Sequence, residues 1–239
     1  MASLYPLAFV DLETTGASAT RDRITEIGIV LVDEHGVHEW SQLIHPQTRI
    51  PVFIEQMTGI TNSMVADAPL FSAVAAEVDG LLKGRLFITH NARFDYGFLK
   101  NEFKRMGLTF QPSVLCTVKL SRTLYPEHRH HNLDSLIARH NLKAKDRHRA
   151  LADAQLIHQF WTDLSERFSP SALDVAIQGL VNRSSLPSNI DPLLVLQLNE
   201  RIRTPPASQS LVFDILRRWD PGFCMSILNY RPNQTALHQ

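Results

Sequence analysis

Two acidic side chains interrupt an otherwise apolar segment near the N-terminus. Asp11 and Glu13 lie within residues 7–13, which have the composition of a buried strand that leaves through a turn at 14–16. Because side chains alternate between the faces of a strand, both acids emerge on the same face. Two buried anions cost several kcal/mol each unless something compensates them. A shared divalent cation would do so, and carboxylate ligands favour Mg²⁺ or Mn²⁺ over Zn²⁺.

Each acidic motif also has a simpler interpretation when it is taken alone. An Asp-x-Glu pair can be solvated at the exposed end of a strand. Asp95 follows a second apolar strand and lies in the first turn of the next helix, where the helix dipole favours an acid. His148 and Asp153 stand at the start of a long helix, and a histidine there is commonly a surface residue. The cation hypothesis therefore depends on these segments occurring together.

Together, three segments resemble the motifs of the DnaQ-like, DEDDh-type 3′ to 5′ exonucleases. They are 9–16 (FVDLETTG), 90–95 (HNARFD) and 148–154 (HRALADA), in the order of that family. The resemblance covers about residues 5–168. It implies an α/β, ribonuclease H-like fold, in which a mixed sheet of a three-strand antiparallel meander plus parallel strands is flanked by helices. It also implies hydrolysis of the terminal phosphodiester bond of DNA, with release of nucleoside monophosphates, in proofreading or repair.

The resemblance implies a role for each residue of the motifs. Asp11, Glu13, Asp95 and Asp153 would hold two divalent cations, Mg²⁺ or Mn²⁺, with Asp11 bridging them. His148 would take a proton from the attacking water, and a positioned base adds about 10²- to 10⁴-fold to a rate. The segment 57–60 resembles one that packs on the terminal nucleotide, and it also fits a helix that ends at Gly59. The implied substrate contacts are Leu12, Thr14, Met57, Thr58, His90 and Asn91.

Strands and helices alternate along the part of the chain that must position these residues. Pro69 suits a helix start, Asn91 occupies an N-cap position, and His35 with Gly36 suits a hairpin turn. Alternation of this kind predicts an α/β domain, which we place at residues 1–168. The expected strands cover 7–13, 24–32, 37–45, 86–89 and 114–116, and the expected helices cover 69–82, the segment after Asn91, 132–140 and 149–168.

Residues 169–239 are expected to form a C-terminal extension of short helices and loops, because Pro-containing breaks punctuate them. The segment 209–213 (QSLVF) loosely resembles the bacterial sliding-clamp peptide, although the start of a short apolar helix is the favoured interpretation. A clamp or DNA polymerase partner is therefore a hypothesis. Residues 186–192 resemble the linker that precedes a GIY-YIG nuclease domain, but no GIY or YIG sequence follows.

The charges are unevenly distributed although their sum is zero. Residues 1–84 carry 4 Lys and Arg against 11 Asp and Glu, whereas residues 85–149 carry 13 against 5. A zero net charge argues against nucleic-acid binding by bulk electrostatics alone. The basic middle third either meets the phosphates of nucleic acid 3′ ends, with single-stranded DNA favoured, or forms a solvated basic face.

Several other classes of protein are not favoured. Cys116 and Cys224 form no CxxC pair, which argues against a disulfide framework or a zinc site. No leader peptide and no run of roughly 18 apolar residues is present, so we expect a cytoplasmic protein without a membrane partner. The segment 128–131 (HRHH) has no cysteine partners, and its spacing favours a polar loop over zinc.

Two further functions compete with a DNA exonuclease. The first is an RNA-directed 3′ exoribonuclease similar to oligoribonuclease or RNase T, which shares the chemistry and the fold. The wording DLETTG looks closer to the proofreading subunits of DNA polymerases. The second is a noncatalytic scaffold of a polymerase or repair assembly, which would have no need to keep all five catalytic positions filled.

Overall fold

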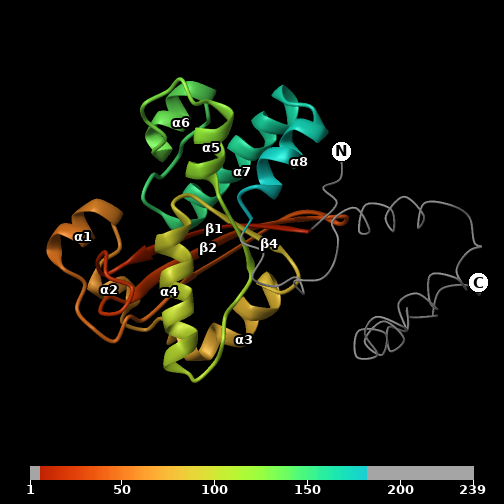
Figure 1. The fold of residues 1–239 in the computed structure, drawn as a ribbon. Helices are drawn as coiled ribbons and strands as arrows, with labels where there is room; N and C mark the ends of the chain where they lie inside the picture. The colour runs from red at the N-terminus through yellow and green to blue at the C-terminus, as the bar shows by residue number, and fades with distance from the viewer. Residues whose placement is uncertain (1–5, 182–239) are drawn as a thin grey trace, which may run out of the picture. The chain divides into compact units, whose positions relative to one another are not determined.

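The central sheet has five strands in the order β3-β2-β1-β4-β5 and carries helices on both faces (Figure 1). It belongs to a computed structural model that describes residues 6–181. Strands β1 to β3 form an antiparallel meander, and β4 and β5 continue the sheet parallel to β1. The predicted mixed sheet is confirmed. The strands are β1 (Leu7–Thr14), β2 (Ile24–Asp33), β3 (Gly36–Leu43), β4 (Leu86–Thr89) and β5 (Ser113–Cys116).

The helices divide between the two faces of the sheet. Helices α3 and α4 cover one face, and α5 to α8 gather at the other (Figure 1). Helices α1 and α2 share a small core of their own around Ile50 and Ile60. The helices are α1 (Val52–Thr58), α2 (Asn62–Val65), α3 (Phe71–Leu82), α4 (Ala92–Arg105), α5 (Thr117–Leu124), α6 (Leu133–His140), α7 (Ala150–Arg167) and α8 (Pro170–Gln178).

Strand β1 lies in the middle of the sheet, and its two sides belong to different cores. Leu7 and Phe9 pack in the core beneath α7, whereas Ala8 and Val10 pack in the core beneath α3 and α4. Since side chains alternate along a strand, Asp11 continues the row that faces α7. The fold therefore directs the acids of β1 toward the helix that carries Asp153.

Gly28 of β2 allows α7 to begin close to the sheet. It pairs with Asp11 in the register of β1 and β2. A Cβ atom at position 28 would lie 2.2 Å from backbone atoms of both Ala150 and Leu151, a distance that no side chain can accommodate. Glycine is therefore required by the close approach of the first turn of α7 to the strands. This contact places the start of α7 beside the acid-bearing end of β1.

The packed core continues beyond the last residue of α7. Leu173 and Ala176 of α8 are buried in the same cluster as residues of β1 and α7. The core thus includes a helix that was expected to open the C-terminal extension. Packing by itself does not assign this helix to a functional domain, so the division at residue 168 stays a prediction. Within residues 6–181, the structure contains no helix with the length and apolar content of a membrane span.

Candidate active site

Side chains from four separate segments line one pocket at the end of β1. The pocket has a volume of about 360 Å³, and its wall includes residues from β1, α1, the β4–α4 junction and α7. The structure therefore brings together segments that are far apart in the sequence. The lining residues that the sequence predicted are Asp11, Leu12, Glu13, Thr14, Met57, His90, Asn91, Asp95 and Asp153.

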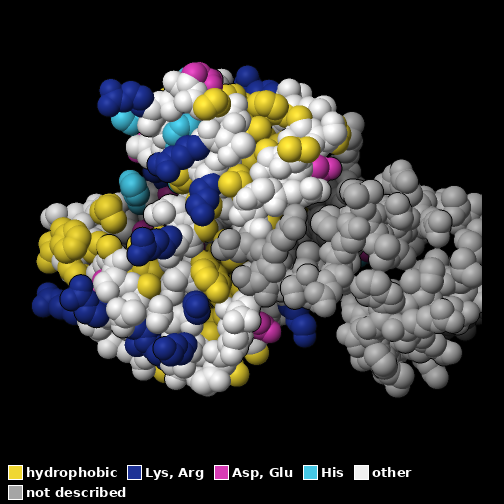
Figure 2. Space-filling model, viewed as in Figure 1, with side chains coloured by type: hydrophobic (Ala, Val, Ile, Leu, Met, Phe, Trp, Pro, Cys, Tyr) yellow, Lys and Arg dark blue, Asp and Glu magenta, His cyan; other side chains and the backbone are white. Residues whose placement is uncertain are grey.

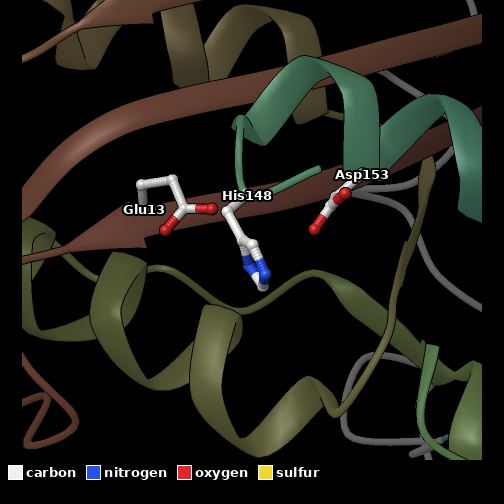
Figure 3. A group of neighbouring side chains, drawn as sticks. All are labelled: Glu13, His148 and Asp153. Carbon is white, nitrogen blue, oxygen red and sulfur yellow. The ribbon is translucent and has the colours of Figure 1, made fainter. Parts of the chain in front are cut away.

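Glu13, His148 and Asp153 form a group of side chains that could hold a metal ion. One ligand atom from each residue lies within 4.8 Å of the other two. Figure 3 shows the imidazole of His148 between the two carboxylates, with Glu13 carried by β1 and Asp153 by α7. His148 itself precedes α7 and has a φ of 64°, in the left-handed region. A histidine so placed can exchange a proton with a water molecule bound between the acids.

Asp11 and Asp95 are the other two acids that line the pocket. Thr89 donates a hydrogen bond of 2.6 Å from its hydroxyl to Asp95 Oδ2, which ties the first turn of α4 to the end of β4. Burial raises the pKa of Asp11 well above its usual range, and repulsion from the other three acids raises it further. The pKa of Asp11 thus responds to all three of the other acids.

Burial makes Glu13 and Asp95 unusually weak acids. It raises the pKa of Glu13 to about 8, with added repulsion from Asp153 and Glu26. It also raises the pKa of Asp95 to about 7, although hydrogen bonds from Thr89 and from backbone N–H groups oppose the rise. Such shifts mean that the ionised cluster lacks compensating positive charge. A divalent cation would supply that charge, so the donor set fits a hard metal ion.

Arg147 supplies part of the missing charge. Its guanidinium is ion-paired with Asp153, and a second nitrogen lies 2.9 Å from Oδ1 of Asp134. It lowers the pKa of both Asp11 and Glu13. Even so, Oδ1 of Asp153 is buried and has no hydrogen-bond partner among the described residues. A buried carboxylate oxygen without a partner is a further sign that this pocket accommodates a cation.

Glu26 of β2 anchors the start of α7. Its carboxylate accepts a hydrogen bond of 2.9 Å from the backbone N–H of Ala150 and two more, of 3.0 and 2.6 Å, from the guanidinium of Arg149. The side chain of Glu26 is 4% exposed, so its carboxylate is largely shielded from water in the ion pair with Arg149. This anchor fixes the segment that carries Asp153, which lines the pocket, and His148, which does not line it but lies beside Glu13 and Asp153.

His90 and Asn91 occupy the junction between β4 and α4. Burial lowers the pKa of His90 to about 4, so this imidazole is neutral near pH 7. Its Nδ1 lies 2.9 Å from the hydroxyl of Thr117 at the start of α5. Asn91 is the N-cap residue of α4, as predicted, but its φ of 69° is left-handed and its side chain makes no capping hydrogen bond. Asn91 is available to the pocket instead of the helix.

Met57 and Thr58 differ in their surroundings although they are adjacent. Met57 lines the pocket and is 50% exposed. Thr58 is buried, and its hydroxyl donates to the carbonyl of Ile54 and accepts from the N–H of Ile60. Its contact with substrate stays a prediction. Gly59 ends α1 in the left-handed conformation with φ of 71°, which confirms the predicted helix C-cap.

Sequence reasoning missed several residues that shape the site. Glu26 interrupts an apolar strand just as the acids of β1 do, and that signal was available. Arg147 carried no signal, because its partners are defined only by the fold. Three further lining residues, Ala17, Phe53 and Ile54, were not singled out from the sequence, and Gly16 and Phe94 belong to the quoted motifs but were given no role at the site.

The predicted polar loop at 128–131 contributes one buried histidine. His131 Nδ1 lies 2.8 Å from the hydroxyl of Ser121, and its Nε2 lies 2.9 Å from the carbonyl of His128. These contacts join the loop to α5. The predicted linker at 186–192, the clamp-like segment at 209–213 and Cys224 lie outside the described residues.

Comparison with known proteins gives one matching family model and many relatives. Residues 8–160 match the model RNase_T, described as Exonuclease. A DNA polymerase III PolC-type from Caldanaerobacter subterraneus subsp. tengcongensis is 38% identical over 158 residues, which are 66% of this chain and 11% of that protein. The 3′-5′ exonuclease DinG of Bacillus subtilis is 38% identical over 161 residues, which are 66% of this chain and 17% of that protein. The chain therefore covers less than a fifth of either relative.

A solved structure has the same fold. It is the nuclease domain of 3′hExo, described as a DEDDh family member bound to rAMP. The two chains superpose with a TM-score of 0.62 at 20% identity, over 70% of this chain and 95% of that one. The likeness confirms the predicted ribonuclease H-like exonuclease fold.

Proposed function

This chain belongs to the RNase_T exonuclease family, and from that premise we propose that it removes nucleotides from the 3′ end of DNA by metal-dependent hydrolysis. The observation that carries the proposal is the convergence of Asp11, Glu13, Asp95 and Asp153 on one pocket, with His148 beside them. Three buried acids and a half-buried one in a single pocket are destabilising in the absence of a cation, so a purely structural role does not account for them.

The acids would hold two divalent cations, Mg²⁺ or Mn²⁺, as the carboxylate donors favour. Bound cations of this kind stabilise the attacking and leaving oxygens of a phosphodiester. Asp11, whose pKa is raised by all three of the other acids, would contribute its carboxylate to holding both cations. Glu13, Asp95 and Asp153 would complete their coordination.

His148 would accept the proton of the attacking water. Its ring lies between Glu13 and Asp153, so a water molecule held by these acids would be within its reach (Figure 3). The anchor formed by Glu26 keeps this segment beside β1. The proton can then pass from the imidazole to solvent or to the departing oxygen.

The apolar part of the pocket would hold the terminal nucleotide. Phe53, Met57 and Phe94 line it, and Phe53 is 65% exposed, which leaves an aromatic face free to stack on a base. Leu12, Thr14, His90 and Asn91 add further contacts, with His90 as a neutral hydrogen-bonding group. This division places the base on apolar side chains and the phosphate on the acids and their cations.

DNA is the proposed substrate because the relative from Caldanaerobacter subterraneus is named a DNA polymerase, of PolC type. The likeness to 3′hExo, a structure bound to rAMP, makes RNA the alternative to be tested. A noncatalytic scaffold is the other alternative, and hydrolysis by the purified chain would exclude it.

The test is a degradation assay on 5′-labelled oligonucleotides. Single-stranded, mismatched and paired DNA are compared with RNA of the same sequence, in Mg²⁺, Mn²⁺ or EDTA. We expect a ladder that shortens from the 3′ end, requires metal and proceeds fastest on single-stranded DNA. An Asp11→Asn variant controls for contaminating nucleases. Degradation that continues in EDTA, or from the 5′ end, would refute the proposal.

A further inference from the structure

Helix α4 begins at the pocket and carries a stripe of cations away from it. Asn91, Phe94 and Asp95 line the pocket at its first turn. Arg93, in the same turn, is exposed, and so are Lys100 and Lys104 farther along. The spacings of seven and four residues place these three side chains within about 40° of one another around the helix axis. They span roughly 16 Å along it, at 1.5 Å per residue.

The outer surface of α4 has no acid to neutralise this stripe. The two acids of the helix, Asp95 and Glu102, are each only 2% exposed. Glu102 is already paired with Arg23 at 2.7 Å and with Arg105 at 2.9 Å. In the part of the chain that the structure describes, no ion pair is found for the cations of the stripe. Figure 2 shows Lys and Arg side chains over the face that includes α4.

An aromatic side chain lies next to the stripe. The Nζ of Lys100 is 5.7 Å from the centre of the Tyr96 ring, and the Tyr96 hydroxyl donates to the carbonyl of Phe110 at 3.4 Å. The ring is therefore held in place and half-buried. Cations interleaved with an aromatic ring are the pattern by which proteins follow the backbone of a single strand.

We propose that Arg93, Lys100 and Lys104 form a track on α4 that binds the phosphodiester backbone of the single strand whose 3′ end occupies the pocket. This inference rests on the proposed function, because it takes the pocket as the position of the 3′ end. Arg93 contacts phosphates near the terminus, and Lys100 and Lys104 contact phosphates several nucleotides upstream. The track gives the enzyme its affinity for longer strands, while the acidic pocket repels phosphates until cations are bound.

The experiment measures binding of a 12-nucleotide fluorescein-labelled DNA strand by anisotropy, in an Asp11→Asn background that prevents degradation. Lys100→Gln and Lys104→Gln are each expected to weaken binding about fivefold at 0.1 M salt, and to reduce the slope of log affinity against log salt concentration by about 0.7. A dinucleotide is too short to reach these lysines, so its binding changes less than that of the 12-nucleotide strand.

Two single-charge variants serve as controls. Lys83→Gln removes an exposed charge before β4, at the opposite end of that strand from the pocket, and should leave binding unchanged. Lys119→Gln removes an exposed charge on α5, on the other face of the sheet, and should weaken binding less than Lys100→Gln or Lys104→Gln does. Equal effects of all four variants, or a loss with Lys119→Gln alone, would overturn the track.

The two proposals can fail separately. If the wild-type chain degrades DNA but the α4 variants bind like the Asp11→Asn parent, the track is wrong and the exonuclease proposal stands. If the chain degrades no nucleic acid while the α4 lysines still govern binding, the track stands and the proposed hydrolysis is wrong.

Discussion

Arg147 is ion-paired with Asp153, one of the four acids of the pocket, and its second partner Asp134 is 74% exposed. The guanidinium thus binds an acid that would otherwise be free to bind a cation, and it supplies part of the positive charge that the cation would supply. Arg147→Gln should destabilise the metal-free protein by about 1 to 3 kcal/mol, because Asp153 loses its buried partner. The variant should also show a larger rise in melting temperature on adding Mg²⁺. Melting curves in EDTA and in Mg²⁺ measure both effects.

Asp134→Asn is the matched control for that experiment, since it removes only the exposed partner of Arg147 and should change stability little. If Arg147→Gln lowers the melting temperature equally with and without Mg²⁺, the guanidinium does not share its place with a cation.

Asp11→Asn should abolish activity while stabilising the metal-free chain. The substitution removes the carboxylate whose pKa is raised by burial and by the other three acids, so their repulsion is relieved. Loss of this proposed metal ligand should reduce turnover more than about 100-fold, the upper end of the range for a residue that only supports a ligand. Gel assays and urea unfolding in EDTA test the two halves. Retained hydrolysis would exclude Asp11 as a ligand.

His148→Ala should reduce turnover about 10²- to 10⁴-fold and leave Mg²⁺ binding intact, as expected for a general base. The measurement matters because the imidazole is close enough to Glu13 and Asp153 to act as a ligand itself. Titration calorimetry with Mg²⁺ decides between the roles. A loss of Mg²⁺ affinity comparable to the loss of turnover would identify His148 as a ligand and not as the base.

The metal-free protein should become less stable as the pH rises from about 5 to about 8. The pKa of Glu13 is about 8 in the folded chain against an ordinary value of 4.5, and that of Asp95 is about 7 against 3.8. Between these values the native state binds more protons than the unfolded state, so its stability falls with increasing pH. Urea unfolding in EDTA at intervals of one pH unit measures the slope.

Glu13→Gln is the control for this pH dependence and should give a shallower decline, because glutamine does not ionise. Mg²⁺ should also suppress the decline, since it binds the ionised form. A stability that is constant or increases between pH 5 and 8 in EDTA would contradict the raised pKa values.

Glu26→Gln should lower turnover by misplacing the start of α7. The variant keeps the size of the side chain but weakens its contacts with Arg149 and with the N–H of Ala150. We expect a loss of about 1 to 3 kcal/mol in unfolding free energy and a 10- to 100-fold loss of turnover, of the order seen for residues that orient ligands. Gln155→Ala, farther along α7, is the matched control. Normal turnover in a destabilised Glu26 variant would limit Glu26 to a structural role.

The sequence by itself predicted the five strands and the helices α3, α4, α6 and α7, because apolar periodicity, turn residues and helix caps act over a few neighbouring residues. It did not predict the short helices α2 and α5. Spacing along β1 also places Asp11 and Glu13 on one face, and the motif order identifies the partners Asp95, His148 and Asp153. The roles of these residues stay predictions until the variants are measured.

Only the tertiary structure decided which distant residues contact one another and which charges form ion pairs. The anchor of Glu26 on the start of α7 joins residues 124 positions apart, and the requirement for glycine at position 28 arises from the approach of a helix distant in sequence. Arg147 likewise joins Asp153 to Asp134, which lies 13 residues before Arg147 in the sequence. Such contacts depend on which residues lie close together in the folded chain. Local patterns of residue type do not contain that information.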